Sequence, residues 1–215
     1  FFGDKTTIRV TYGTGFKHPS LYQLYSTYGN MGLESENSQT VDVSWEQNIT
    51  TKIKTSIDYF KNNYRNLIDF DTGTSKYMNV ASADSDGVEV QGQYEFNAQN
   101  GVRAVYTYLQ TEDGQTGGRL LRRPQNSASL MAYTQIGKVS GLIQCRFVDE
   151  RDDIDPATFT RVKNPSYELV NLKAEYRALK DLRISVRLQN LFDRQYEEIY
   201  GYGTAGRSFY IGLSN

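Results

Sequence analysis

Hydrophobic and polar residues alternate along most of this chain with a period of two. In segment 6–13, Ile8, Val10 and Tyr12 alternate with Thr and Arg residues. Successive side chains of a β-strand point to opposite faces, so this pattern predicts strands with one apolar and one polar face. Comparable segments lie at 41–46, 53–59, 88–96, 170–176 and 182–189, with weaker ones at 102–111, 125–136, 139–148 and 206–213. We therefore expect about ten strands.

The connections between these segments are alternately short and long. The short ones are 48–51, 97–101, 137–138 and 179–181, and the long ones are 14–37, 61–83, 112–124, 149–166 and 191–205. Outer-membrane barrels have short periplasmic turns and long external loops, and strands of about ten residues cross a bilayer when tilted. The sequence predicts an all-β fold: an antiparallel transmembrane β-barrel portion of about ten strands with long outer loops and short periplasmic turns.

A soluble β-sandwich or barrel would also alternate, with its apolar face turned inward. The expected strands exceed the length of about five or six residues that is common in soluble sheets. Many of the 17 Tyr and 10 Phe residues lie at strand ends. Aromatic residues at that position are typical of the girdles at a membrane interface. Both features favour the membrane barrel.

Composition narrows the function classes further. The mean hydropathy is −0.61, and no run of about 18 apolar residues is present, which excludes a helical membrane span. The balance of 24 basic and 25 acidic residues gives no support for nucleic-acid binding. Cys145 is the one cysteine and His18 the one histidine, so we expect no internal disulfide, no metal site and no cofactor.

Two motifs resemble those of TonB-dependent outer-membrane receptors. Residues 13–25 read GTGFKHPSLYQLY and residues 29–36 read GNMGLESE, which together resemble the family's GxFKAPSLxQLY … GNPNLKPE box. Residues 190–197, NLFDRQYE, resemble the NLFDKxYE signature of the family's penultimate strand. His18 replaces the usual Ala of the box, and NMGL at 30–33 replaces NPNL.

Further segments resemble the vitamin B12 (cobalamin) receptor branch of this family. They are YGYGTAGR at 200–207, LLRR at 120–123, and LIDF at 67–70 with KYMN at 76–79. Siderophore receptors share several of these. The resemblance implies a Gram-negative outer-membrane receptor and transporter for TonB-driven uptake of a large scarce nutrient, with cobalamin as the first candidate. A ferric siderophore (iron-chelate) or haem receptor is the alternative, and a passive porin or adhesin barrel is an alternative of another class.

The resemblance also implies partners. Such receptors have barrels of about twenty-two strands closed by an N-terminal plug domain. Residues 1–215 would be the C-terminal part of that barrel, so the plug, the remaining strands and the contact with the TonB complex would be supplied elsewhere, with the lipid bilayer around them. The chain opens on Phe1 without Met and ends at Asn215 without a terminal aromatic residue, which also leads us to expect a fragment.

Candidate ligand-binding residues lie in two of the long loops. By resemblance, Arg122, the first arginine of LLRR, lies where the cobalamin receptor's loops meet their ligand, and a guanidinium could donate to corrin amide carbonyls. The other reading is an arginine at the membrane rim. In the first long loop, Tyr22, Tyr25, Tyr28 and Asn30 could grip a large rigid ligand. Their alternative role is in the interfacial girdle and loop packing.

Charged residues on the polar faces of the strands form a second candidate set. In an intact receptor they would contact the plug through hydrogen bonds and ion pairs, whereas a channel-selectivity role would require an unplugged lumen. The set comprises Arg9, Asp42, Glu46, Lys54, Asp58, Glu89, Glu95, Lys173, Glu175, Arg183 and Arg187.

Three weaker hypotheses concern the acidic segment 149–155 and the histidine. Asp152, Asp153 or Asp155 could imitate a catalytic pair with His18, but no nucleophile motif accompanies them and we expect no enzyme. The acidic segment could instead hold Ca²⁺ or be a solvated charge run. His18 could serve as an axial haem ligand or be a polar loop residue.

Overall fold

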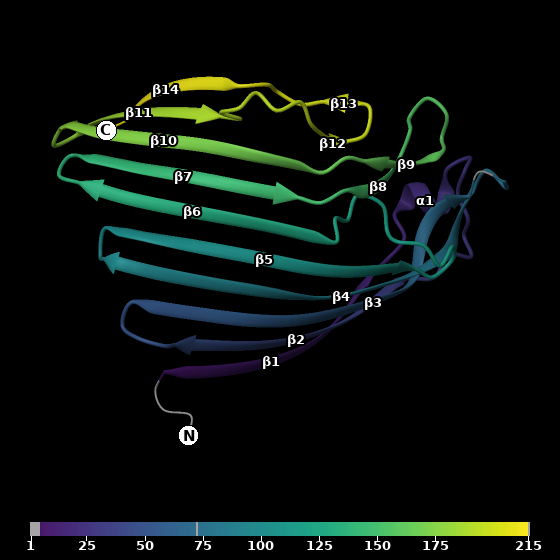
Figure 1. Ribbon diagram of the computed structural model, residues 1–215. Helices are drawn as coiled ribbons and strands as arrows, with labels where there is room; N and C mark the ends of the chain where they lie inside the picture. The colour runs from purple at the N-terminus through teal and green to yellow at the C-terminus, as the bar shows by residue number, and fades with distance from the viewer. Residues whose placement is uncertain (1–4, 72, 215) are drawn as a thin grey trace.

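In the computed structural model, which describes residues 5–71 and 73–214, ten strands form one antiparallel sheet (Figure 1). Sheet order follows chain order, except that β8, β9, β12 and β13 lie outside it. The ten strands are β1 (Thr6–Lys17), β2 (Glu36–Asn48), β3 (Ile53–Asp71), β4 (Lys76–Asn97), β5 (Asn100–Asp113), β6 (Asn126–Ile136), β7 (Val139–Val148), β10 (Tyr167–Leu179), β11 (Leu182–Gln189) and β14 (Ser208–Ser214). The expected all-β, antiparallel architecture is confirmed. Phe1 and Asn215, on which the expectation of a fragment rests in part, lie outside the described residues.

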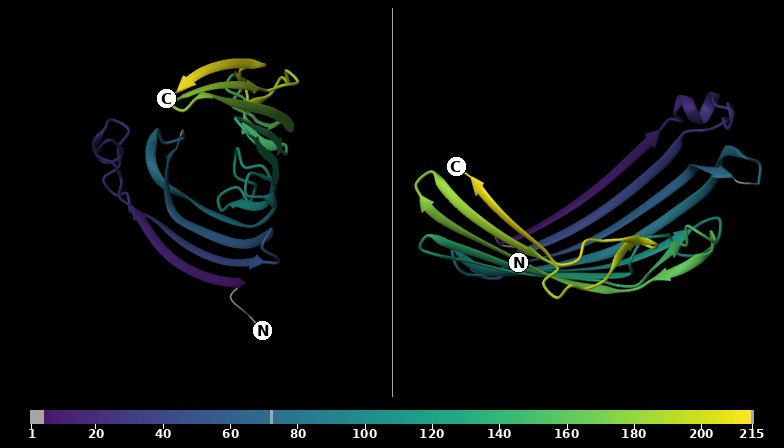
Figure 2. Two further views of the ribbon diagram at one scale, coloured as in Figure 1. Left: turned by 90° about the vertical axis from the view of Figure 1, so that its left-hand side faces the viewer. Right: turned by 90° about the horizontal axis from the view of Figure 1, so that it is seen from above.

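The sheet curves into an open trough, with β1 and β14 as its two edges (Figure 2). The four short turns lie together at one end of the strands, and the long loops lie at the other (Figure 1). We call these the short-turn end and the long-loop end. Gly137, in the two-residue turn between β6 and β7, has φ of 59°, which glycine adopts without steric cost. The short and long connections that alternate along the sequence therefore lie at opposite ends of the sheet.

The two faces of the sheet differ in chemistry, as the period-two pattern predicts. Register pairs Val10 with Val43, Val43 with Tyr59, Tyr59 with Val88 and Val88 with Tyr108, which places a continuous apolar row across five strands. Val10, Val43, Tyr59 and Tyr108 are exposed, Val10 to 69%, and Val88 is half-buried. A face of large exposed hydrophobic residues suits a lipid environment, whereas a soluble sandwich would bury it.

The connection at 61–83 differs from the expectation of a long loop. β3 and β4 extend through it as a hairpin and leave only 72–75 between them. The register shifts between Tyr64 and Leu67, where Asn66 has a φ of 56°. The sequence gives no alternation here because apolar residues stand next to each other, as in Leu67-Ile68 and Tyr77-Met78, so a period-two signal is lost although the backbone pairing continues.

Three of the four remaining long connections contain short elements of their own. β8 (Arg151–Ile154) pairs with β9 (Arg161–Asn164), and β12 (Glu197–Ile199) pairs with β13 (Tyr202–Gly203). The first long loop holds α1 (Leu21–Tyr25), which begins at a capping box between Ser20 and Gln23. This helix is far too short to cross a membrane, and no other helix of the described residues could do so.

Candidate ligand-binding site in the long loops

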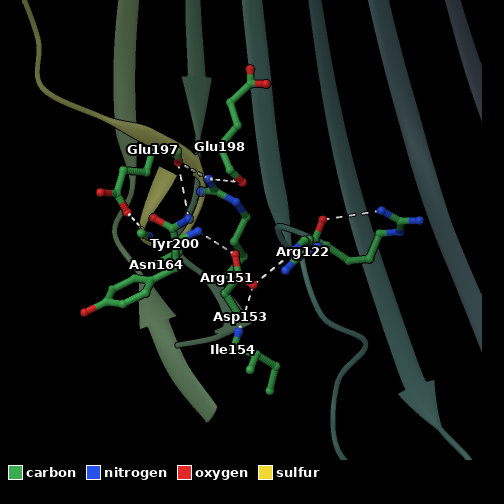
Figure 3. A network of polar contacts seen from close by, with 10 residues as sticks. Arg122, Arg151, Asp153, Ile154, Asn164, Glu197, Glu198 and Tyr200 are labelled. Carbon is green, nitrogen blue, oxygen red and sulfur yellow. Dashed lines mark hydrogen bonds and ion pairs between the residues drawn. The ribbon is translucent and has the colours of Figure 1, made fainter. Parts of the chain in front are cut away.

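Three connections, 114–125, 149–166 and 190–207, come together at the long-loop end and are here called the charged loop assembly. At its centre is Asp153, whose side chain is fully buried. Arg122 donates from Nε to Asp153 Oδ1 over 2.8 Å, and the Tyr200 backbone N–H donates to Asp153 Oδ2 over 2.9 Å. Figure 3 shows Asp153 between these two donors, each from a different loop. One carboxylate thus joins all three connections.

Hydrogen bonding dominates the charge state of Asp153. Burial alone would raise the pKa of this carboxyl, but the N–H groups of Tyr200 and Ile154 and the Arg122 guanidinium outweigh it and hold the pKa below its ordinary value. The carboxylate is therefore ionised at neutral pH. An ionised, buried acceptor fixes the direction in which Arg122 points.

Arg122 keeps donor capacity for a ligand. Its backbone N–H donates to Asp152 O over 2.7 Å in a conformation with φ of 58°, so both main chain and side chain are held. The side chain is 45% exposed, and within residues 5–71 and 73–214 only Nε has a protein partner. The two terminal amino groups of the guanidinium face solvent as oriented donors.

Arg151 ties the β8–β9 hairpin to the last long loop. It is 4% exposed and donates to the carbonyl oxygens of Glu197, of Glu198 at 3.0 Å and of Pro165 at 3.4 Å (Figure 3). Its guanidinium also lies 5.3 Å from the centre of the Tyr167 ring. A buried guanidinium that serves three carbonyls and an aromatic face acts as a cross-link between loops.

A small apolar cluster lies under this network. Val148, Tyr167 and Leu169 are buried, and Tyr196 from the last loop packs against them. The Tyr167 and Tyr196 ring centres are 4.6 Å apart. Val148 and Leu169 belong to the otherwise polar face, so the loop 190–207 folds over that face and buries its upper end. The charged loop assembly is therefore anchored on the sheet.

The acidic residues of segment 149–155 are mostly engaged by cations of the same assembly. Asp152 accepts from Arg161 at 2.8 Å and from Lys163 at 3.0 Å, and these bonds lower its pKa. No group of three or more metal-ligating side chains occurs among the residues that the structure describes. The arrangement supports neither the Ca²⁺ hypothesis nor a catalytic pair with His18, whose Nδ1 instead contacts Ser35 Oγ at 2.8 Å.

The first long loop forms a second assembly with the tip of the β3–β4 hairpin. Residues 18–35 and 66–79 are here called the aromatic loop assembly. Tyr22 contacts Tyr77, Tyr77 contacts Phe70, and Phe70 contacts Tyr28, each pair edge to face with ring centres 5.4 to 6.1 Å apart. Tyr25 makes no such contact among the described residues and is 68% exposed.

Asn30 has a structural role in this assembly. Its side-chain amide donates to Tyr77 O over 3.2 Å, and its carbonyl oxygen accepts from the Gly32 N–H over 2.9 Å. Both ends of the amide are occupied, so Asn30 holds the loop onto the hairpin. Of the four first-loop candidates, Tyr25 therefore offers the most free surface to a ligand, and Tyr22 and Tyr28 offer partly exposed rings.

The eleven charged candidates all lie on the polar face of the sheet, in two groups, one on β1 to β4 and the other on β10 and β11. Glu46 contacts Arg9, Glu95 lies 3.9 Å from Lys54, and Glu175 lies 3.7 Å from Lys173 and 3.8 Å from Arg183. Arg187 stacks over Tyr210 with 4.6 Å between the guanidinium carbon and the ring centre. Asp58 accepts from Ser56 and Glu89 from Thr107, while Asp42 shares the same face.

Sequence reasoning missed the residues that organise the charged loop assembly. Arg151, Asn164, Tyr167 and Tyr196 are buried or half-buried, yet they lie in segments that read as polar loop or strand end. Short alternations, Arg-Asp-Asp-Ile at 151–154 and Arg-Val-Lys-Asn at 161–164, are the one available signal for a hairpin. Four-residue strands are too short to separate from loop sequence by periodicity.

The geometry defines a curved antiparallel sheet of ten strands, of the kind found in the wall of a membrane β-barrel, with long loops gathered at one end. The chain belongs to the TonB-dependent receptor-like β-barrel family, whose model matches residues 2–191. This family consists of receptors, in line with the expectation of a protein that is not an enzyme.

Several solved structures share the fold of this chain. A mutant of the ferric enterobactin receptor from Pseudomonas aeruginosa is 21% identical with a TM-score of 0.84, covering 99% of this chain and 38% of that one. The ferripyoverdine receptor of the outer membrane of Pseudomonas aeruginosa is 20% identical with a TM-score of 0.78, covering 97% and 30%. The copper transporter OprC is 17% identical with a TM-score of 0.80, covering 99% and 37%. The chain thus spans about a third of the structures it matches.

Proposed function

We propose that this chain is the C-terminal barrel portion of an outer-membrane receptor that takes up a ferric siderophore, driven by the TonB complex. The plug domain and the remaining strands complete the receptor. Family membership supports the receptor class, and similar structures include receptors named for ferric enterobactin and ferripyoverdine. The siderophore class becomes the first candidate in place of cobalamin because several of the similar structures are named for ferric siderophores.

One observation carries the proposal, the charged loop assembly with Arg122 at its surface. Buried Asp153 orients the guanidinium, and its terminal amino groups remain accessible. Arg123, Arg161 and Lys163 in the same assembly are exposed as well. Ferric chelates of the catecholate type are anionic, and fixed guanidinium groups donate well to such oxygen-rich anions. The assembly would thus form the capture surface above the polar face.

Cobalamin uptake is the second candidate function, and a specific observation favours it. The LLRR and YGYGTAGR segments carry the resemblance to the cobalamin branch, and residues from both meet at the same carboxylate. Arg122 donates to Asp153 Oδ1 and Tyr200 to Asp153 Oδ2. The two segments would then occur together because both are needed to hold Asp153 in place. Haem remains a third ligand to test.

The eleven charged residues of the polar face are proposed to contact the plug. Several ion pairs among them are exposed in this chain, such as Lys54 with Glu95 and Arg183 with Glu175. Exposed pairs contribute little stability by themselves. Charged side chains that are held only by such weak pairs can form new ion pairs and hydrogen bonds with a second polar surface, as contact with the plug requires.

The test is equilibrium binding to the full-length receptor in detergent, with ferric enterobactin, cyanocobalamin and haem as separate probes. We expect tight binding of the ferric chelate and a loss of about tenfold or more for Arg122→Ala. The matched control is Arg65→Ala, which removes an equally exposed arginine paired with Asp84 at 3.0 Å.

Tight cobalamin binding that falls with Arg122→Ala would establish the second candidate instead. Binding of haem alone would exclude both. An Arg65→Ala effect equal to that of Arg122→Ala would overturn the placement of the site, because both variants would then act through overall charge.

A further inference from the structure

The apolar face of the sheet carries a groove of about 700 Å³ across strands β5 to β14. Its floor consists of small residues, because Gly141 lies opposite both Thr134 on β6 and Ala174 on β10. Phe96 and Phe209 line the groove and are 50% and 59% exposed. A row of small side chains between large ones makes an apolar furrow.

The groove opens near the short-turn end of the sheet. Phe96 immediately precedes the β4–β5 turn, and Gly141 and Ala174 lie within a few residues of the β6–β7 and β10–β11 turns. Those two turns are neighbours, because the Arg177 N–H donates to Lys138 O over 2.9 Å. Charged side chains in these two turns therefore lie close to the open end of the groove.

These adjacent turns are basic. Lys138 and Lys180 are exposed, and neither forms an ion pair within the part of the chain that the structure describes. Arg177 pairs with Arg183 in the register and so lies on the polar face, away from the groove. Asp181 is the acidic residue next to Lys180, so the two cations and this one anion leave a net charge of +1. Long basic side chains at a membrane interface reach toward lipid headgroups while their stems cover apolar surface.

We propose that this groove is a binding site for one anionic phospholipid of the inner leaflet. An acyl chain lies on Gly141 and Ala174, and the phosphate is bound by Lys138 and Lys180. The leaflet assignment rests on the proposed outer-membrane placement, with short turns in the periplasm. The pairing of apolar furrow and unpaired cations is what distinguishes this place from ordinary lipid-facing surface.

A second groove on the same face provides an internal comparison. It measures about 530 Å³, contains Gly92 and Ala128, and lies farther from the short turns. Glu168 adds a negative charge to its lining, and Arg146, also in the lining, lies 3.8 Å from Glu198. This groove has an apolar furrow without unpaired cations, so it should accept acyl chains without selecting an anionic headgroup.

The experiment is native mass spectrometry of the full-length receptor in detergent, titrated with palmitoyl-oleoyl phosphatidylglycerol and, separately, with the phosphatidylcholine of the same chains. We expect one phosphatidylglycerol to remain bound in preference to phosphatidylcholine. Lys138→Gln should weaken the preference about fivefold, and the double variant with Lys180→Gln should weaken it further.

Two leucine variants test the furrow. Gly141→Leu fills the proposed site, where an added Cβ would lie 3.4 Å from Thr134 Cγ2, and it should abolish retention of the lipid. Gly92→Leu fills the second groove, where a Cβ meets nothing within 4 Å, and should leave the phosphatidylglycerol preference unchanged. If Gly141→Leu fails to fold, the lysine-to-glutamine variants still test whether the lipid preference depends on the cations of the turns.

Equal retention of the two lipids, or a preference untouched by the lysine variants, would overturn the proposal. A preference lost equally in Gly92→Leu would also overturn it. Binding of ferric enterobactin is measured on the same preparations. If the lipid preference is absent but ferric enterobactin still binds, the lipid proposal fails and the proposed function stands. If the lipid preference is present but ferric enterobactin does not bind, the proposed function fails and the lipid site stands.

Discussion

The charged loop assembly and the aromatic loop assembly occupy the same end of the sheet but are held by different forces. In the first, buried Asp153 and Arg151 connect three loops through charge-assisted hydrogen bonds. In the second, edge-to-face rings and main-chain contacts connect one loop to one hairpin, and every tyrosine that the sequence proposed there stays at least 47% exposed.

This difference teaches what each assembly can do. Buried ionic networks have strict geometric demands and are costly when one member is lost, so they fix side chains in one arrangement. Aromatic contacts are non-directional by comparison and tolerate shifts. The charged loop assembly is suited to hold a donor such as Arg122 in place, and the aromatic loop assembly to adapt to a ligand's shape.

The largest effect is expected from Asp153→Ala. The substitution leaves Arg122 and the Tyr200 and Ile154 N–H groups without their acceptor, at a cost of about 3 kcal/mol in local stability. Hydrogen exchange of 149–166 and 190–207 in the full-length receptor measures it. The control Asp84→Ala breaks an exposed pair with Arg65 and should cost less than about 1 kcal/mol. Equal effects would contradict the contrast between buried and exposed pairs.

Arg151→Lys should come next. Lysine keeps the charge but cannot reach the carbonyls of Pro165, Glu197 and Glu198 together, so we expect a loss of about 2 kcal/mol in protection of 196–203. Hydrogen exchange is again the readout. Arg194→Lys, at an exposed arginine of the same loop, is the control and should change little. If Arg151→Lys resembled its control, Arg151 would not be the cross-link.

A smaller effect is expected from pH. The folded pKa of Asp153 lies below the ordinary value of 3.8, so its stabilising contribution is complete above that pH and is lost as the pH falls below it, through the folded pKa. Protection of 190–207, corrected for intrinsic exchange, should therefore fall selectively in acid. Asp153→Asn should flatten this dependence, with Asp152 accounting for what remains. A protection profile that is the same in Asp153→Asn would exclude Asp153 as its source.

Phe70→Leu should have a modest effect confined to the aromatic loop assembly. It removes ring contacts to both Tyr28 and Tyr77, at a cost of about 1 kcal/mol. Limited proteolysis within 18–35 reports it, because that loop packs on the hairpin through these rings. Phe159→Leu, at an 81% exposed phenylalanine of the other assembly, is the control. Any spread of the effect to 149–166 would show that the two assemblies are coupled.

The smallest effect on stability is expected from Tyr25→Ala. Its side chain is 68% exposed, so the free energy of unfolding should change by less than about 0.5 kcal/mol. Chelate binding could still fall, because the exposed ring is free for a ligand. A thermal unfolding curve and a binding isotherm on the same sample separate the two. A large loss of stability would mean that Tyr25 packs in a way that its exposure does not indicate.

The sequence predicted the ten strands well because lipid-facing and polar residues alternate wherever a strand crosses the apolar layer. It failed at 61–83, where β3 and β4 continue with apolar residues next to each other, as in Leu67-Ile68, so no period-two pattern marks the pairing. For the site, Arg122 and the loop tyrosines were identified by motif and residue type. Asp153 read as part of an acidic run, because its burial depends on loops far apart in the sequence.

One feature of the topology has an engineering consequence. β7 and β10 pair in unbroken register from Val148 with Tyr167 to Val139 with Tyr176, so the segment between them leaves and re-enters the sheet at one point. The β8–β9 hairpin thus branches from the sheet, and loops with adjacent ends tolerate replacement at little entropic cost. A peptide grafted between Asp149 and Ser166 would leave the strand pairing intact but would remove Arg151 and Asp153, so the graft would also release the loops 114–125 and 190–207 from each other.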